Sequence, residues 1–280
     1  MKYALYHGNC YDGFGAAFAA WKKFGDGAKY IPVSYGQPIP DLSKATEVFI
    51  VDFSYSAEIL AEIAESLKLT VLDHHKTAQE ALSEFSHPNA VVVFNMSKSG
   101  ALLSWEHFHE GTEAPLLIQH ISDRDLWLFK MDGSSKVHKA LVSYPMEFKL
   151  WDSFDVEKLK IEGEACERLY SNIVSTTCEK YWFTEIGGFS VPVVNTAMAW
   201  SEVGAELVEK NPDAPFVASF TIMKNSVMWS LRSKGDFDVS EIAKKYGGGG
   251  HKNAAGFKSV KLEINIEAAP MATHPNPQGE

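Results

Sequence analysis

The chain has 280 residues, of which 45% are hydrophobic and 22% charged, so it is long enough for two globular domains and is neither disordered nor fibrous in composition. Its formal net charge of −10 excludes a general positive field that would attract long nucleic acids or anionic membranes. No apolar run is long enough for a signal peptide or a membrane span, and Cys10, Cys166 and Cys178 form no Cys-x-x-Cys pair, so we expect a cytoplasmic protein with reduced thiols.

Short, largely apolar runs alternate with helix-like segments in the first half of the chain. Apolar residues have helical spacing at 14–21 and at 59–67, and the runs between them are predicted strands: Tyr3 to Tyr6, Val48 to Val51, Thr70 to Leu72 and Ala90 to Phe94. Uninterrupted apolar strands are typical of a parallel sheet that is covered by helices on both faces. We therefore predict an α/β domain with a parallel sheet over residues 1–145.

Three of these predicted strands run directly into side chains that can bind metal ions. The first ends at His7, the second at Asp52, and the third at the triplet Asp73-His74-His75. Ligands bind at the carboxyl ends of parallel strands, so we expect these groups to form one site. Carboxylates and imidazoles without an obligatory thiolate suit Mn²⁺ first and Mg²⁺ second.

Two further segments are predicted to reach the same site. Asp12 precedes the small residues at 13–17, which allow a backbone or a ligand to approach a helix start closely. Asp123 and Asp125 form an acidic pair after the apolar residues at 116–118. Any one of these side chains is more often a helix cap or a structural residue, but their coincidence at one edge of a sheet favours a metal centre.

The second half of the chain has a different pattern. Residues 146–188 are charged and helical in pattern, with no strand expected before Val191, and are predicted to form a helical connector. Strand patterns at 216–223 and 227–231 and a helix capped by Asp238 predict a smaller α/β domain over 189–266. The proline-containing segment 267–280 has little apolar content and is predicted to be a flexible tail.

Two signatures in this sequence resemble those of a known family. The Asp-His-His triplet at 73–75, with the segments around Asp12, Asp52 and Asp123, resembles the DHH phosphoesterase superfamily. The glycine-rich segment 247–257 resembles the signature of the DHHA1 domain that accompanies it. The resemblance implies a dinuclear, usually manganese, centre in the first domain and an active site in the cleft between the two domains. Family members cleave short oligonucleotides, cyclic dinucleotides, single-stranded nucleic acid, polyphosphate or pyrophosphate.

The resemblance also implies roles for single residues. His7 would bind one ion and Asp52 would bridge both. The remaining ligands of the second ion would be Asp12, His74 and Asp123. His75 would face the scissile phosphate and act with Asp52 in catalysis, and Asp73 would orient the imidazoles as an outer partner.

Substrate-binding groups are expected from the second domain. Arg232, at the end of a predicted strand, is a candidate for a bidentate grip on a terminal phosphate. His251, with the backbone amides of Gly249 and Gly250, is a candidate for a second phosphate contact.

The first motif departs from the commonest pattern of the family, which has a histidine, an aspartate four residues later and a second aspartate two residues further on. Here His7 is followed by Asn9, Cys10, Tyr11 and Asp12, so one carboxylate is missing. The ion held by His7 must then use water, Asn9, Cys10 or a substrate oxygen, and either one or two ions would bind.

The favoured function is hydrolysis of phosphodiester bonds in short oligonucleotides or small nucleotides by metal-activated water. The acidic composition argues against long duplex or single-stranded polymers, and no membrane partner is expected. Two alternatives stay open: an exopolyphosphatase-like or pyrophosphatase-like hydrolase, and a non-catalytic nucleotide-binding protein with a degraded metal site. The exact substrate, the polarity of attack and the oligomeric state also stay open, with a homodimer as one option.

Overall fold

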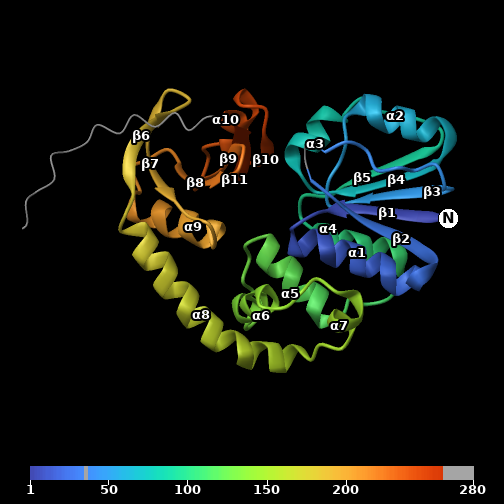
Figure 1. Cartoon of the computed structure of the whole chain (residues 1–280), viewed down its shortest axis with the longest axis horizontal. Coiled ribbons are helices and arrows are strands. Elements are labelled where there is room, and N and C mark those ends of the chain that lie inside the picture. Colours follow the sequence, from blue (N-terminus) through green and yellow to red (C-terminus); the bar gives the residue numbers. More distant parts are fainter. Residues whose placement is uncertain (35–36, 261–280) are drawn as a thin grey trace, which may run out of the picture.

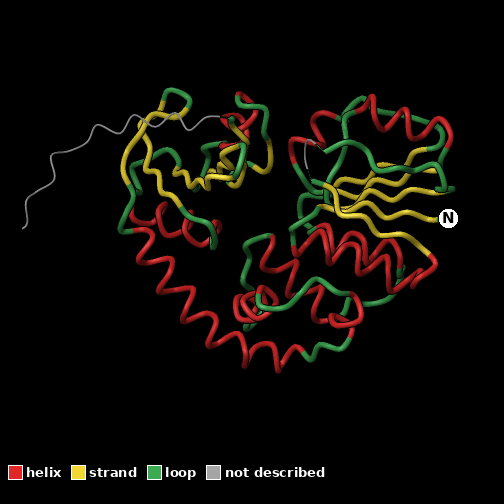
Figure 2. Tube along the Cα trace, viewed as in Figure 1, coloured by secondary structure: helices red, strands yellow, loops and turns green. Residues whose placement is uncertain are grey.

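The computed structural model describes residues 1–34 and 37–260, and the tail predicted at 267–280 lies outside this range. Two sheets lie at the ends of an arc whose outer side is formed by one long helix (Figures 1 and 2). Within the described residues, no helix combines the length and the apolar character that crossing a membrane requires.

The first sheet is parallel throughout and has the strand order β2-β1-β3-β4-β5. The strands are β1 (Lys2–His7), β2 (Ala28–Val33), β3 (Glu47–Val51), β4 (Lys68–Asp73) and β5 (Ala90–Phe94). Helices α1 (Tyr11–Phe24) and α4 (Gly100–Phe108) cover one face, and α2 (Ala57–Ser66) and α3 (Lys76–Ala81) cover the other (Figure 1). The order reverses between β1 and β3, where doubly wound sheets bind their ligands.

Both faces of the central strands β1, β3 and β4 are largely buried, which explains their uninterrupted apolar runs. Phe49 and Val51 pack into the core beneath α1 and α4, whereas Val48 and Ile50 pack into the core beneath α2. The predicted parallel α/β fold of the first half is confirmed.

Four helices follow the first sheet and lead to the second: α5 (Leu116–Asp125), α6 (Ser134–Val142), α7 (Phe148–Asp152) and α8 (Val156–Cys178). Trp151 of α7 is fully buried, and its ring packs against that of Phe14 with a centroid distance of 4.6 Å. Asp155 caps helix α8, because its side chain accepts hydrogen bonds from the amides of Glu157 and Lys158, and the helix runs for 23 residues to the second sheet (Figure 1).

The second sheet has the strand order β10-β11-β9-β8-β7-β6 and is antiparallel except between β7 and β8. Its strands are β6 (Trp182–Ile186), β7 (Phe189–Asn195), β8 (Val217–Met223), β9 (Ser226–Arg232), β10 (Gly249–His251) and β11 (Ala254–Ser259), with helices α9 (Trp200–Lys210) and α10 (Val239–Lys245). The smaller C-terminal α/β domain is therefore present.

The expectation of no strand before Val191 is wrong, because β6 begins at Trp182 inside the range predicted as connector. Residues 182–186 form a short edge strand that includes the polar residues Thr184 and Glu185, which gave a weaker signal than the helical pattern before it. The division of the chain at residues 145 and 188 stays a prediction.

The two halves contact each other at two separate places. On one side, Lys76 of α3 pairs with Asp238, and the amide of Gly250 donates to Thr77 Oγ1 at 3.2 Å. On the other side, Glu202 of α9 accepts from Lys139 and Arg124 of the first half. These contacts hold the second sheet against the carboxyl ends of the first.

Candidate metal centre

The carboxyl ends of three neighbouring strands bring His7, Asp52 and His74 together. His74 Nε2 lies 3.1 Å from Asp52 Oδ1 and 3.5 Å from Asp12 Oδ2, and His7 Nδ1 lies 3.5 Å from Asp52 Oδ2. Asp12, Asp52 and His74 are each at most 2% exposed. The sequence-based expectation that these strand ends converge therefore matches the geometry.

Asp52 has an uncommon backbone conformation, with φ 62° in the left-handed region. Such a conformation in a non-glycine residue costs about 1–3 kcal/mol and occurs mainly at functional sites. Helix α4 packs directly against this residue, because a Cβ atom on Gly100 would lie 2.5 Å from Asp52 Cβ. A glycine at position 100 thus allows the helix start to approach the centre.

Asp12 connects the centre to the same helix start. Its two carboxylate oxygens accept hydrogen bonds from the amides of Gly100 at 2.6 Å and Ala101 at 3.0 Å. The partial positive charge of a helix N-terminus stabilises a carboxylate in this position. Even so, burial and the neighbouring charges of Asp52 and Asp125 raise the pKa of Asp12 well above its usual value.

The structure places Asp125, and not the predicted Asp123, beside the centre. Asp125 Oδ2 lies 3.6 Å from His74 Nε2. The carboxylate of Asp123 accepts instead from Ser134 Oγ at 2.6 Å and from the amides of Lys130 and Met131. Residues two positions apart on an α-helix point roughly 200° away from each other, so only one of the two can face the metal ligands.

Asp73 is fully buried and holds the His-His pair in place. Its Oδ1 accepts from the amides of His74 at 2.7 Å and His75 at 3.2 Å, and it lies 2.7 Å from His75 Nδ1. Burial lowers the pKa of His75, but the charge and hydrogen bond of Asp73 outweigh it and raise that pKa. These contacts are those of an orienting residue.

His251 reaches the centre from strand β10 of the second half. Its ring stacks on that of His75 with a centroid distance of 4.7 Å and lies 4.8 Å from that of His74. Burial, together with the positive charges of His75 and His74, lowers the pKa of His251 to about 3. The imidazole is therefore neutral at physiological pH.

Gly249 and Gly250 hold β10 against α3. A Cβ atom on Gly249 would lie 2.7 Å from Thr77 Oγ1, and the Gly250 amide donates to the same hydroxyl. The predicted phosphate contact by the Gly250 amide therefore competes with a bond between the two halves.

Arg232 lies with Arg124 and Glu202 at the junction of the two halves. Its guanidinium donates to Ser230 Oγ and Leu231 O and, at 3.0 Å, to Ser201 Oγ. Burial and the positive charge of Arg124 lower the pKa of Arg232 to about 10. Two guanidinium groups that repel each other in this way favour binding of an anion between them.

The donor set fits divalent cations. Two buried carboxylates and the partly buried Asp125 surround one imidazole, and none of the ion pairs in the described part of the chain joins these carboxylates to a lysine or an arginine. Three groups of potential ligands share Asp52, with all ligand atoms of each within 4.8 Å: His7–Cys10–Asp52, Asp12–Asp52–His74 and Asp52–Asp73–His75. In the third group Asp73 is the hydrogen-bond partner of His75, so the first two are the candidate cation sites. This arrangement suits two cations with Asp52 between them.

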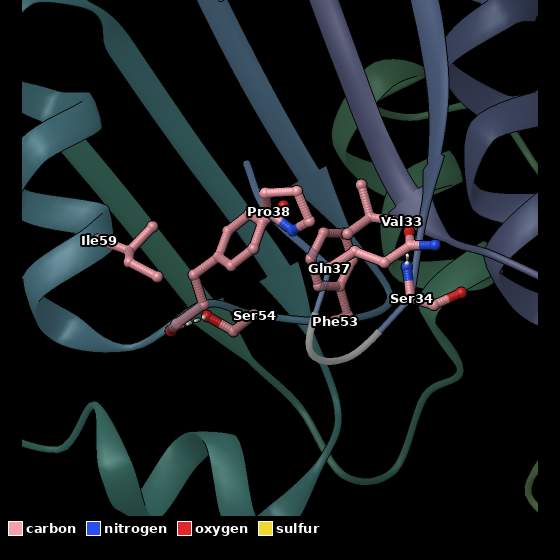
Figure 3. Close-up of a pocket in the computed structure, with 8 residues that line it drawn as sticks. Val33, Ser34, Gln37, Pro38, Phe53, Ser54 and Ile59 are labelled. Atoms are coloured by element: carbon pink, nitrogen blue, oxygen red, sulfur yellow. Dashed lines mark hydrogen bonds between the residues drawn. The ribbon is translucent and has the colours of Figure 1, made fainter. Parts of the chain in front are cut away.

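A hollow of about 440 Å³ opens at the same edge of the sheet (Figure 3). Its walls come from the ends of β2 and β3 and from α2, and include Val33, Phe53, Tyr55 and Ile59. The hollow begins one residue after Asp52, but the candidate ligands do not line it. The metal chemistry belongs to the carboxylate and histidine cluster beside it.

Comparison with known proteins gives the family of this chain. Residues 194–270 match the family model of the DHHA1 domain. The chain is 33% identical to the uncharacterized protein R106 of Acanthamoeba polyphaga mimivirus, over 92% of this chain and 68% of that protein. It is 26% identical to the oligoribonuclease NrnB of Bacillus subtilis (strain 168), over 91% of this chain and 72% of that protein.

The fold is shared with a solved structure. The crystal structure of RecJ in complex with Mn²⁺ from Thermus thermophilus matches with a TM-score of 0.51 and 15% sequence identity, over 92% of this chain and 49% of that chain. Together with the family match and the relatives, this shows that the chain belongs to the DHH/DHHA1 phosphoesterase superfamily, whose members are metal-dependent hydrolases.

Proposed function

We propose that this phosphoesterase uses Mn²⁺ to hydrolyse phosphodiester bonds in short oligonucleotides or small nucleotides. The observation that carries the proposal is the cluster of Asp12, Asp52, His74 and Asp125 at the strand ends, which His251 approaches from the second half. The relative NrnB is an oligoribonuclease, and the RecJ of similar fold binds Mn²⁺, which supports the substrate class and the ion.

Divalent cations bound at this centre would neutralise phosphate oxygens and lower the pKa of a water molecule. The remaining steps fall to the side chains. With Nδ1 of His75 held by Asp73, Nε2 is the nitrogen available to the substrate. We propose that His75 donates a proton to the leaving oxygen, a role that the raised pKa of its ring favours.

Aromatic side chains near Asp125 favour a nucleotide over an inorganic phosphate chain. Trp127 and Phe129 are 41% and 42% exposed and lie edge to face at 5.0 Å, directly after the end of α5. The guanidinium of Arg124 lies 5.1 Å from the Trp127 ring. Bases stack on such surfaces, whereas polyphosphate has no group that could use them.

Hydrolysis of a substrate panel with Mn²⁺ tests the proposal. The panel holds a dinucleotide, a five-residue oligonucleotide, a cyclic dinucleotide, polyphosphate and pyrophosphate, each with the wild type, Asp52→Ala and the surface control Asp213→Ala. We expect the wild type to release mononucleotides from the first two substrates. Asp52→Ala should lose this activity, and Asp213→Ala should keep it. Cleavage of the inorganic substrates alone would favour the phosphatase alternative, and bound Mn²⁺ without any turnover would favour the nucleotide-binding alternative.

A further inference from the structure

Counted back from Asp12, Cys10 stands two residues earlier, where the family pattern has its first aspartate. The structure shows where its side chain lies. Its sulfur belongs to a group with His7 and Asp52 in which all potential ligand atoms are within 4.8 Å of one another. Asn9, the neighbouring alternative, is exposed and has φ 56°.

Cys10 also stands at the N-cap position of α1, where a thiol is a weak cap. It precedes α1 with φ −126° and ψ 134°, where Ser, Thr, Asp or Asn would normally accept a hydrogen bond from the first helical turn. The Gly13 amide approaches its sulfur, but a thiol is a weak hydrogen-bond acceptor. Helix capping is therefore a weak reason for a cysteine here, and its proximity to His7 and Asp52 is a stronger one.

Two of the ligand groups that share Asp52 differ in chemistry. His7, Cys10 and Asp52 offer nitrogen, sulfur and oxygen, whereas Asp12, Asp52 and His74, with Asp125 beside them, offer mainly oxygen. Thiolates favour Zn²⁺ and other borderline cations, and oxygen-rich sites favour Mn²⁺ and Mg²⁺. One centre would then hold two different ions.

We propose that Cys10 is a metal ligand and that His7, Cys10 and Asp52 form a subsite that prefers Zn²⁺ or Co²⁺ to Mn²⁺, while the carboxylate-rich subsite takes Mn²⁺. On binding, the thiol releases its proton to solvent and a sulfur lone pair forms the bond to the cation, so no oxidant or reductant is needed. The inference uses the centre of the proposed function but does not require turnover.

Cobalt spectroscopy on the full-length protein tests the sulfur ligand directly. The metal-free protein is titrated with Co²⁺, and a thiolate-to-cobalt charge-transfer band is expected in the near ultraviolet. The band should disappear in Cys10→Ser and remain in the control Cys166→Ser, because Cys166 lies on α8 and belongs to none of the ligand groups of the described residues. Cys10→Ser should also weaken Co²⁺ binding by at least about tenfold, since loss of an outer-shell partner alone costs 10- to 100-fold.

The variant Cys10→Asp restores the carboxylate of the family pattern and guards against loss of folding. It should bind two Co²⁺ ions without the band. After equilibration with equal concentrations of Zn²⁺ and Mn²⁺, the wild type should hold one ion of each, whereas Cys10→Asp should hold more Mn²⁺ and less Zn²⁺. Two Co²⁺ ions bound to the wild type without a band, or a band that survives in Cys10→Ser, would overturn the inference. If the band is present but the substrate panel is silent, the proposed function fails and the sulfur ligand stands.

Discussion

Variants of Asp123 and Asp125 distinguish a structural role from a role in metal binding. Asp125→Asn should lower Mn²⁺ affinity and kcat/KM by at least about tenfold, because the carboxylate lies beside His74. Asp123→Asn should leave the activity per folded molecule unchanged and lower the free energy of unfolding by about 1–3 kcal/mol, because the turn at 130–134 loses a charged acceptor. Calorimetric Mn²⁺ titration and urea unfolding measure the two effects, and a swap of the two phenotypes would contradict the placement.

Trp127 should contribute to the binding of nucleotides and not to the chemical step. Stacking of one base is worth about 1–3 kcal/mol, so Trp127→Ala should raise KM for a five-residue oligonucleotide by roughly 5- to 150-fold with kcat nearly unchanged. The matched control is Phe183→Ala, which removes another exposed ring, on β6. An unchanged KM in Trp127→Ala, or an equal rise in Phe183→Ala, would exclude this stacking role.

At the scale of the elements, Glu202 ties α9 to α5 and α6 in a pH-dependent way. Burial raises the pKa of Glu202, but the positive charges of Arg124 and Lys139 outweigh it and lower that pKa. A carboxylate with a depressed folded pKa stabilises above its unfolded pKa of about 4.3 and loses this contribution as pH falls through the folded value. The wild type should therefore lose stability below about pH 4.3.

The variant Glu202→Gln isolates this contribution. It should be less stable than the wild type at pH 7, because Lys139 is only 4% exposed and would lose its partner. The difference between the two proteins should shrink in acid, where the wild-type carboxylate is also neutral. Thermal unfolding from pH 7 to pH 3 measures both curves, and a difference that grows toward acid pH would refute the assignment.

How far the elements follow from the sequence depends on their surroundings. The central strands β1, β3 and β4 are predictable because both faces are buried and the runs are continuous. The edge strands β2 and β6 escape prediction, because β2 contains Pro32 and β6 is a run of only five residues that includes the polar residues Thr184 and Glu185.

Prediction of the site residues also depends on how each one is held by the fold. The residues at strand ends were found because a strand fixes where its last side chain lies. Asp125 was not separated from Asp123, because the rotation of α5 is set by packing. Arg124 and Trp127 carried no pattern of their own, although their adjacency to an acidic metal candidate was a usable signal.

For the whole molecule, two ion pairs between α3 and the α10 region of the second half, in addition to those of Glu202, help to hold the second sheet over the centre. Lys76 pairs with Asp238, and Lys244 lies 2.5 Å from Glu80. Because partly exposed pairs contribute at most about 1 kcal/mol each, the double variant Lys76→Gln/Lys244→Gln should still fold but open more often. We expect a larger radius of gyration in small-angle X-ray scattering and a higher KM.

The control has the same change of charge within one half of the molecule. Lys98→Gln/Lys136→Gln removes pairs with Glu106 and Glu164, neither of which joins the second sheet to the first. An equal expansion in this control would show that net charge, and not the contact between the halves, determines the shape.

Helix α8 fixes both the distance between the two halves and the rotation of one half relative to the other. Its 23 residues span roughly 35 Å, and each residue also turns the chain by about 100°. Deleting a single residue would move the second sheet by only about 1.5 Å but rotate it by more than a quarter turn, which would carry His251 away from His75. Deleting seven residues, close to two full turns, would nearly keep the rotation and shorten the span by about 10 Å. In evolution, length changes in this segment should therefore arise in steps of whole helical turns, because only these keep the orientation of the second sheet relative to the first.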